Sequence, residues 1–245
     1  RHGSRLDLPP DGKLYGFGLM PKSSLPPATN ATSSYLPALR WHTLTPAYDA
    51  VVRATSGERR FKRRFVDHAQ LTTRERVLDV GCGTGTLLAA LGGRTSGLTL
   101  AGVDRDPTML SRAAARVVHL GAGLCVGDAR RLPIATGTVD VVVSSLFFHH
   151  LLDDAKSLVL AELRRVLTSS GRLVIADWGA PRSLASRLGA AVVRTFDGEA
   201  PTRTNFAGRL ADCIADAGFE SVRVVDRVGV PLGVIDMITA TARKS

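Results

Sequence analysis

Asp79-Val80-Gly81-Cys82-Gly83-Thr84-Gly85-Thr86 is the stretch that decides the fold of this 245-residue chain. Its three alternate glycines allow a tight turn and let the backbone lie against a ligand that a Cβ would exclude. The apolar run 77–80 predicts a buried strand before the loop, and the run 86–91 predicts the start of a helix after it. The pattern is therefore strand, glycine loop, helix, with the N–H groups of the helix facing any ligand on the loop.

The spacing of the glycines separates this loop from a dinucleotide-binding loop. A dinucleotide fingerprint, G-x-G-x-x-G, would place its third glycine at position 86. Here that position is Thr86, and the glycine comes one residue earlier, at Gly85. The spacing argues against a dehydrogenase. An acidic residue, Asp79, also precedes the loop, where it can meet an ammonium group of a ligand.

Strands and helices alternate outward from the loop. Further short apolar strands are expected at 98–103, 124–126, 139–143 and 171–176. Helices are expected between them, over 106–118 and 153–167. After Asp177 the sequence predicts helices near 183–195 and 203–217, then apolar segments at 221–226 and 233–240. The pattern predicts an α/β fold: a Rossmann-like open sheet of mostly parallel strands with an antiparallel C-terminal strand and helices on both faces.

The sequence predicts one domain with a different N-terminal part. Residues 1–34 are rich in Pro, Gly, Ser and Thr and are expected to form a flexible extension. Residues 35–245 would form the domain, divided into a helical lid over 36–70 and the Rossmann-like core over 76–245. Within the lid, Phe61, Phe65 and Ala69 fall at i, i+4 and i+8, the apolar stripe of an amphipathic helix.

Composition excludes several classes of protein. The chain is 44% hydrophobic and 22% charged, an ordinary globular composition that excludes wholesale disorder and coiled coils. No apolar run approaches the roughly 20 residues of a membrane span. The three cysteines have no C-x-x-C spacing, which argues against a disulfide framework or structural zinc and favours a cytoplasmic protein.

The net charge of +10 leaves open what the basic run 59–64 does. The run falls on the amphipathic helix, and a solvated helix face is the preferred interpretation. An RNA or membrane-surface patch is the second, although no aromatic residues are interleaved for base stacking. A role near an anionic ligand is the third.

A series of motifs in order carries a resemblance to a known family over residues 45–242. The glycine loop matches (D/E)-x-G-x-G-x-G. The other matches lie at the ends of the second, third and fourth strands and in the helix and turn that come next. They are Asp104, Gly127-Asp128-Ala129, Ser144-Ser145, and Glu162 to Leu167 with Gly171. In this order they resemble the class I S-adenosylmethionine-dependent methyltransferases. The resemblance implies S-adenosyl-L-methionine as cofactor and in-line methyl transfer to a small-molecule O, N, C or S nucleophile.

The resemblance also implies roles for particular residues. Asp104 would bind both ribose hydroxyls, and Asp128 would meet the adenine amino group. The full set of implied cofactor-binding residues is Asp79, Gly81, Cys82, Gly83, Gly85, Asp104, Arg105, Asp128, Ala129, Ser144 and Tyr48.

Within the family the chain is similar to the ubiquinone/menaquinone-biosynthesis type and its small-molecule relatives. Tyr48-Asp49 matches a Tyr-Asp pair before the first motif. The stretch from Ser56 to Lys62 resembles a Gly-x-His-Arg-x-Trp-Lys pattern, with Glu58 in place of His and Phe61 in place of Trp. The match keeps Arg59 and Lys62 as ligand contacts and leaves the quinone substrate open.

The segment after the fourth strand holds the candidates for catalysis. His149 and His150 lie at the carboxyl edge of the sheet, where ligands bind, and an unperturbed histidine pKa near 6.5 suits a general base. The alternative is that one of them caps the next helix or hydrogen-bonds the loop. Phe147 and Trp178 would line the acceptor pocket, with plain core packing as the alternative for Phe147. No metal site is expected, because adjacent histidines do not share a helix face.

Two other functions stay in view. An RNA methyltransferase would suit the positive charge, but the fourth-strand motifs of base-methylating enzymes are absent at Ser144 to Phe147. A non-catalytic cofactor-binding domain is the second, against which the intact acids at 79, 104 and 128 argue. The expected partner is a small-molecule methyl acceptor rather than a nucleic acid, and no oligomeric state is predicted.

Overall fold

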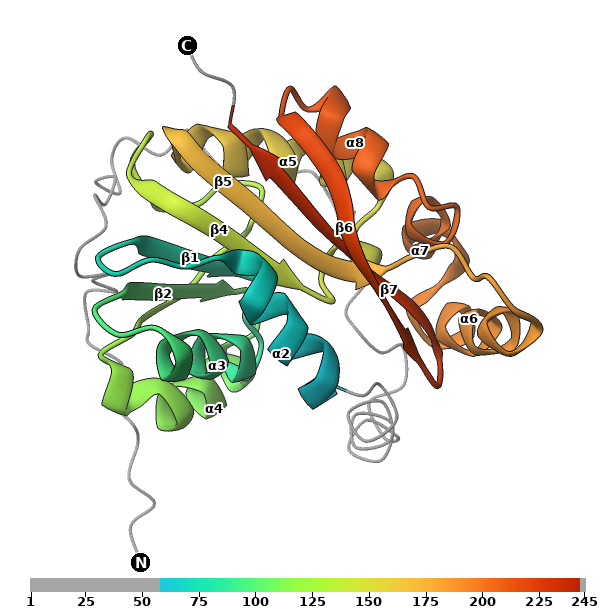
Figure 1. The fold of residues 1–245 in the computed structure, drawn as a ribbon, viewed down its shortest axis with the longest axis horizontal. Helices are drawn as coiled ribbons and strands as arrows, with labels where there is room; N and C mark the ends of the chain where they lie inside the picture. The colour runs from blue at the N-terminus through green and yellow to red at the C-terminus, as the bar shows by residue number, and fades with distance from the viewer. Residues whose placement is uncertain (1–57, 243–245) are drawn as a thin grey trace, which may run out of the picture.

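The computed structural model of the protein describes residues 58–242, which form a seven-stranded sheet (Figure 1). The strand order is β3-β2-β1-β4-β5-β7-β6. The strands are β1 (Arg76–Val80), β2 (Thr99–Asp104), β3 (Gly123–Val126), β4 (Val139–Ser145), β5 (Leu167–Trp178), β6 (Glu220–Val230) and β7 (Gly233–Thr241). The pairs from β3 to β5 are parallel, and β7 is antiparallel to both β5 and β6. The predicted open sheet with an antiparallel C-terminal strand is confirmed.

Helices cover both faces of the sheet. They are α2 (Glu58–Ala69), α3 (Thr86–Arg94), α4 (Pro107–Val117), α5 (Asp153–Val166), α6 (Leu184–Asp197), α7 (Glu199–Phe206) and α8 (Leu210–Asp216), with 3-10 turns η2 (Val118–Leu120) and η3 (Phe148–His150). One hydrophobic cluster packs α5 and α8 against one face, and a second packs α2, α3, α4 and α6 against the other. The central strands β1, β2 and β4 and the later part of β5 are buried on both sides, which explains their continuous apolar runs. Within residues 58–242, no helix has the length and apolar character needed to cross a membrane.

One predicted helix is two helices in the structure. The sequence predicts a single helix over 203–217, but α7 ends at Phe206 and α8 begins at Leu210. Between them Gly208 adopts a left-handed φ of 73°, and its N–H donates to the carbonyl of Asn205. A glycine in this conformation ends a helix, because it satisfies the last carbonyls while the chain turns away.

Helix α2 joins the core through the predicted apolar stripe. Phe61, Phe65 and Ala69 are all fully buried. The end of the helix is fixed by Arg172 on β5, whose guanidinium donates to the carbonyls of Ala69 and Gln70. The predicted flexible extension 1–34, the rest of the predicted lid up to residue 57, and Tyr48 lie outside the described residues.

Parallel strands bring chemistry-bearing residues to one edge of the sheet. β1, β2, β4 and β5 all run in the same direction, so their carboxyl ends meet. Asp79, Asp104, Ser145 and Asp177 occupy or adjoin those ends. In open α/β sheets this is the edge where ligands bind.

Candidate active site

The glycine loop has the geometry that its sequence predicts. Gly81, Gly83 and Gly85 all have positive φ, at 71°, 51° and 71°. The N–H groups of Gly81 and Cys82 donate to the carbonyl of Val103, so that the loop is held against the end of β2. α3 follows directly, and no side chain caps its N-terminus. The first N–H groups of α3 therefore stand at the loop without a capping side chain.

Gly81 is required for a further reason, which is close approach by an aromatic ring. A Cβ built on Gly81 would lie 2.5 Å from a ring carbon of Phe147. Phe147 is half-buried and packs edge-on against Phe148, with ring centroids 5.6 Å apart. The glycine loop and the segment after β4 are therefore in direct contact, with the Phe147 ring packed on Gly81.

Asp79 is a buried carboxyl group without a hydrogen-bond partner. Its residue is 1% exposed, and neither carboxylate oxygen has a partner among the described residues. Burial and the neighbouring Asp104 carboxylate raise its pKa to about 7, and the positive charge of Lys62 acts in the opposite direction. A buried acceptor left unpaired is costly, so this position is suited to a cationic hydrogen-bond donor on a ligand.

Asp104 ends β2 and holds the loop. Its Oδ2 accepts from the N–H of Gly83 at 2.7 Å, and its Oδ1 accepts from the N–H of Asp106 at 2.9 Å. Each oxygen keeps a second lone pair for a ligand hydroxyl. Asp106 itself caps α4 through the N–H of Thr108, as its position before Pro107 suggests. Arg105, between them, is exposed.

Asp128 is already engaged by an arginine that sequence reasoning missed. Arg130 Nη2 lies 2.6 Å from Asp128 Oδ2, and Arg130 Nε lies 3.0 Å from Oδ1. This pairing lowers the pKa of the Asp128 carboxyl, and Arg105 adds to the effect. The Asp128 side chain keeps 39% of its surface exposed, so it can still accept from an exocyclic amine. Ala129 between them packs against the hydrophobic core.

Ser144 is buried within the sheet. Its hydroxyl donates to the carbonyl of Val80 at 2.8 Å, which ties β4 to the end of β1 beside the glycine loop. Cys82 is also buried, and burial with the nearby Asp79 and Asp104 carboxylates raises its pKa well above the usual range. This thiol stays protonated, as expected for a packing residue.

The two histidines of η3 have different environments. His149 Nδ1 lies 2.7 Å from Asp177 Oδ1, and this carboxylate also accepts from the N–H groups of Phe147, Phe148 and Trp178. Asp177 holds the pKa of His149 above its usual value despite burial. Burial and the adjacent His149 lower the pKa of His150 to about 3.

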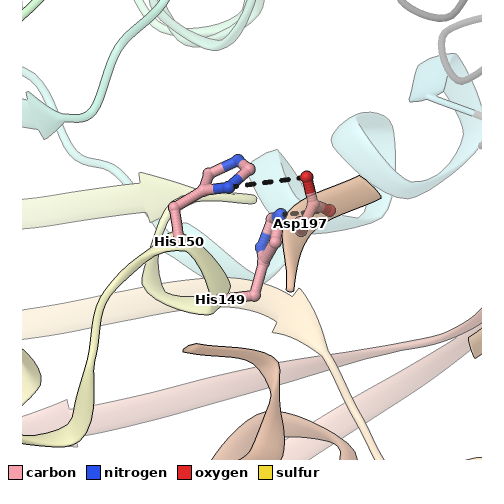
Figure 2. Close-up of side chains that lie close together, drawn as sticks. All are labelled: His149, His150 and Asp197. Atoms are coloured by element: carbon pink, nitrogen blue, oxygen red, sulfur yellow. Dashed lines mark ion pairs between the residues drawn. The ribbon is translucent and has the colours of Figure 1, made fainter. Parts of the chain in front are cut away.

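Asp197, the last residue of α6, faces both histidines (Figure 2). Its Oδ2 lies 3.7 Å from His149 Nε2, and its Oδ1 lies 3.8 Å from His150 Nδ1. Sequence reasoning missed both Asp177 and Asp197 as site residues. Asp177 could have been found, because it ends β5 much as Asp104 ends β2; no local signal marks Asp197.

Trp178 is more deeply buried than a pocket-lining residue needs to be. It is 3% exposed, with its ring centroid 6.3 Å from that of His149 and 6.2 Å from that of Phe206. It packs edge-on against the ring of His149. Any contact of Trp178 with an acceptor remains a prediction.

The fold and this edge define a class of protein. A 3-2-1-4-5-7-6 sheet with an antiparallel β7, a glycine loop after β1 and acids at the ends of β1 and β2 has the features expected of a class I methyltransferase. Residues 78–175 match a family model described as "Methyltransferase domain". This stretch of the chain is therefore similar to a methyltransferase domain, and it lies in a fold like that of the class I S-adenosylmethionine-dependent methyltransferases.

Curated relatives refine the likeness. The chain is 35% identical over 142 residues to a demethylmenaquinone methyltransferase of Thermus thermophilus, covering 56% of this chain and 64% of the relative. It is 30% identical over 145 residues to a ubiquinone/menaquinone biosynthesis C-methyltransferase of Citrifermentans bemidjiense, covering 56% and 61%. The chain thus spans less than two thirds of the length of these relatives.

Solved structures agree with the fold. A phosphoethanolamine N-methyltransferase 2 of Haemonchus contortus superposes with a TM-score of 0.59 at 16% identity, over 75% of this chain and 52% of that one. A methyltransferase of Aquifex aeolicus that depends on S-adenosylmethionine superposes with a TM-score of 0.56 at 21% identity, over 79% and 97%. At these identities the likeness concerns the fold.

Proposed function

We propose that the protein transfers a methyl group from S-adenosyl-L-methionine to a small-molecule acceptor. The single observation that carries the proposal is Asp79, a buried carboxyl group at the end of β1 with both oxygens unpartnered among the described residues. Beside a glycine loop, such a group fits the ammonium of an amino-acid moiety. When bound, S-adenosylmethionine supplies an electrophilic methyl group on a positively charged sulfur.

The residues around the loop would bind and orient the cofactor. Asp79 accepts from the ammonium group, and Asp104 accepts from ribose hydroxyls while it fixes Gly83. Asp128, held in place by Arg130, accepts from the adenine amine. The loop residues Gly81, Cys82, Gly83 and Gly85, with Arg105, Ala129, Ser144 and Tyr48, complete the proposed set. These contacts align the reacting atoms, which is the main task in a transfer from an already activated donor.

The acceptor would lie beyond Phe147, on the side of η3. His149 is the better general base of the two histidines, because Asp177 orients its ring and raises its pKa, whereas the pKa of His150 is about 3. An acidic acceptor would need no base. Phe147 and Trp178 would supply the apolar wall on which the acceptor rests.

The relatives point to a first acceptor class to test. Two of the relatives are named as a demethylmenaquinone methyltransferase and as a C-methyltransferase of ubiquinone/menaquinone biosynthesis, so we propose a hydroxylated aromatic ring of the quinol type as the acceptor. A cytoplasmic location is part of the proposal; it is supported by the three cysteines, which are all free. No observation in the described structure favours RNA, and the partnerless Asp79 carboxyl group argues against a domain that has lost its ligand.

A transfer assay tests the proposal. Purified full chain would be given S-adenosylmethionine labelled in its methyl group with a demethylated quinol, with phosphoethanolamine or with RNA. Label in the quinol, lost in Asp79→Asn, is the expected result. Label in RNA alone would overturn the small-molecule assignment. Tight cofactor binding with no transfer to any small molecule would support the non-catalytic alternative.

A further inference from the structure

Three potential metal ligands converge at the acceptor side of the site. We propose that His149 Nε2, His150 Nδ1 and the Asp197 carboxylate (Figure 2) bind one divalent transition-metal ion of the zinc type. Asp177, which lies behind His149 in the structure, would hold that ring in place. One ligand atom from each of the three residues lies within 4.8 Å of the others. This inference goes beyond the proposed methyl transfer and does not depend on it.

The separations of the ligand atoms suit a shared ion better than direct contact. The two N···O distances, 3.7 and 3.8 Å, are too long for hydrogen bonds. Ligands at about 2.0–2.1 Å from a tetrahedral zinc ion lie about 3.3 Å from one another. Since one ligand atom from each residue lies within 4.8 Å of the others, a shift of up to about 1 Å in each side chain would close the three ligands on an ion.

The outer partner of His149 is the one that metal-binding histidines usually have. Asp177 Oδ1 lies 2.7 Å from Nδ1, and the carboxylate favours the tautomer in which Nδ1–H donates to it. In the neutral ring this tautomer leaves the lone pair on Nε2, the atom nearer Asp197. Carboxylate–histidine pairs of this kind fix the ring and its tautomer for a metal ion. Three backbone N–H groups in turn hold Asp177, so the ring orientation is set by the backbone.

The 3-10 turn explains how two adjacent histidines can bind the same ion. On an α-helix, neighbouring side chains point to different faces. Here both residues lie in the short 3-10 turn η3, and their ring centroids are only 4.0 Å apart. Asp197 reaches both rings from the C-terminal end of α6, where the helix dipole also favours a cation.

Burial and charge also suit a cation. The side chains of His149 and Asp197 are 5% and 7% exposed, and that of His150 is 22% exposed. Two carboxylates, Asp177 and Asp197, face the pair, against one buried ammonium group, that of Lys156. Three protein ligands leave a fourth position for water or for an acceptor oxygen. At His149 Nε2 an ion and a proton exclude each other, so His149 could not act as a base while an ion is bound. The ion would instead lower the pKa of a hydroxyl bound to it, and the proton of that hydroxyl would leave to solvent.

Metal binding is measured directly, with no need for turnover. The full chain would be prepared without a histidine tag and stripped of metal with a chelator. It would then be titrated with Zn²⁺ in competition with a chromophoric chelator. A second titration would use Co²⁺, whose visible absorption reports its binding. We expect one tight site per chain, with loss of that site in His150→Ala and in Asp197→Asn. Asp177→Asn should weaken binding by roughly 10- to 100-fold, the usual effect of removing an outer partner.

A matched control and a folding check complete the design. His119→Ala removes a histidine of η2 outside the cluster and should leave the affinity unchanged. Circular dichroism and thermal melts confirm that each variant is folded, and His150→Ala is the safest of them because its side chain is partly exposed. No Zn²⁺ or Co²⁺ binding by the wild type, or equal affinity in folded His150→Ala and Asp197→Asn, would overturn the proposal.

Cofactor binding separates this proposal from the proposed function. S-adenosylhomocysteine binding by the metal-free protein, without a metal site, would remove this inference and leave the function intact. A metal site without cofactor binding would remove the proposed function and leave the metal site intact.

Discussion

The carboxylate of Asp177 lies 2.7 Å from His149 Nδ1, at a depth where the two side chains are 1% and 5% exposed. Asp177 comes from the end of β5 and His149 from the turn after β4, so this single contact ties two neighbouring strand ends together at the ligand-binding edge. Because the same carboxylate accepts from the N–H groups of Phe147 and Phe148, it also fixes the path of the segment that packs on Gly81.

Asp177→Asn should therefore destabilise the protein strongly. The substitution removes the buried carboxylate in direct contact with His149 and leaves the more distant Asp197, and breaking a buried pair costs about 3–5 kcal/mol. We expect the free energy of unfolding in urea to fall by about 3 kcal/mol. Asp154→Asn, at an exposed position on α5, should change it by less than about 1 kcal/mol. Equal stability of the two variants would contradict the role given to Asp177.

Asp79 should make the stability of the ligand-free protein depend on pH. Its pKa is raised to about 7 in the folded protein from 3.8, so between these values the folded state holds a proton that the unfolded state has lost. Stability conferred by this group is highest at low pH and falls as the pH rises toward 7. The difference in unfolding free energy between Asp79→Asn and wild type should therefore grow in favour of the variant from pH 4 to pH 7. A constant difference would contradict the assignment.

Cofactor binding should have the opposite pH dependence at the same residue. An ammonium group on the ligand requires ionised Asp79, so binding below pH 7 must expel a proton. We expect the affinity for S-adenosylhomocysteine to rise with pH and to level off above about 7. Titrations in buffers of different ionisation enthalpy count the released proton. No proton release at pH 6 would contradict contact between Asp79 and the ammonium group.

Asp104 and Asp106 form a matched pair of acids two residues apart. Asp104 faces the loop, whereas Asp106 only caps α4. Asp104→Ala should weaken S-adenosylhomocysteine binding by about 10-fold or more, since buried ligand hydroxyls lose their acceptor. Asp106→Ala should cost about 1 kcal/mol of stability and leave the affinity unchanged. Equal losses of affinity would show that the effect at Asp104 is structural.

Gly81→Ala tests the packing of the Phe147 ring against the glycine loop. Both Gly81 and Gly121 have a left-handed φ, 71° and 63°, but only a Cβ on Gly81 would meet another residue, the Phe147 ring at 2.5 Å. Gly121→Ala therefore measures the backbone strain alone. We expect Gly81→Ala to be less stable than Gly121→Ala by about 1–3 kcal/mol in thermal or urea unfolding. Equal stability would mean that the ring moves away freely.

The fold could be predicted because its signals are local. The alternation of apolar runs, the glycine loop, and the capping pair Asp106-Pro107 each depend on a few neighbouring residues. They suffice to predict a mostly parallel open sheet with an antiparallel C-terminal strand, whereas the order of the strands comes from the structure. Element ends were less well predicted: β5 begins at Leu167 rather than near 171, because its first residues pair with Val139 on β4.

The cofactor side of the site was also visible in the sequence, but the acceptor side was not. Asp79 and Asp104 stand at fixed spacing from the glycines. Asp197 meets His149 only through the fold, since α6 must pack back toward η3 before the carboxylate reaches the rings. Arg130 was missed for another reason, because a pairing two residues away from Asp128 depends on the turn that the loop makes there.

Calorimetric titration of the purified protein with S-adenosylhomocysteine, with NADH as the control ligand, tests the central claim most directly. We expect saturable binding of S-adenosylhomocysteine alone, weakened by about 30-fold or more in Asp79→Asn, which corresponds to the loss of about 2 kcal/mol for a buried charge contact. Binding of NADH in its place, no binding of S-adenosylhomocysteine, or unchanged affinity in Asp79→Asn would contradict the account.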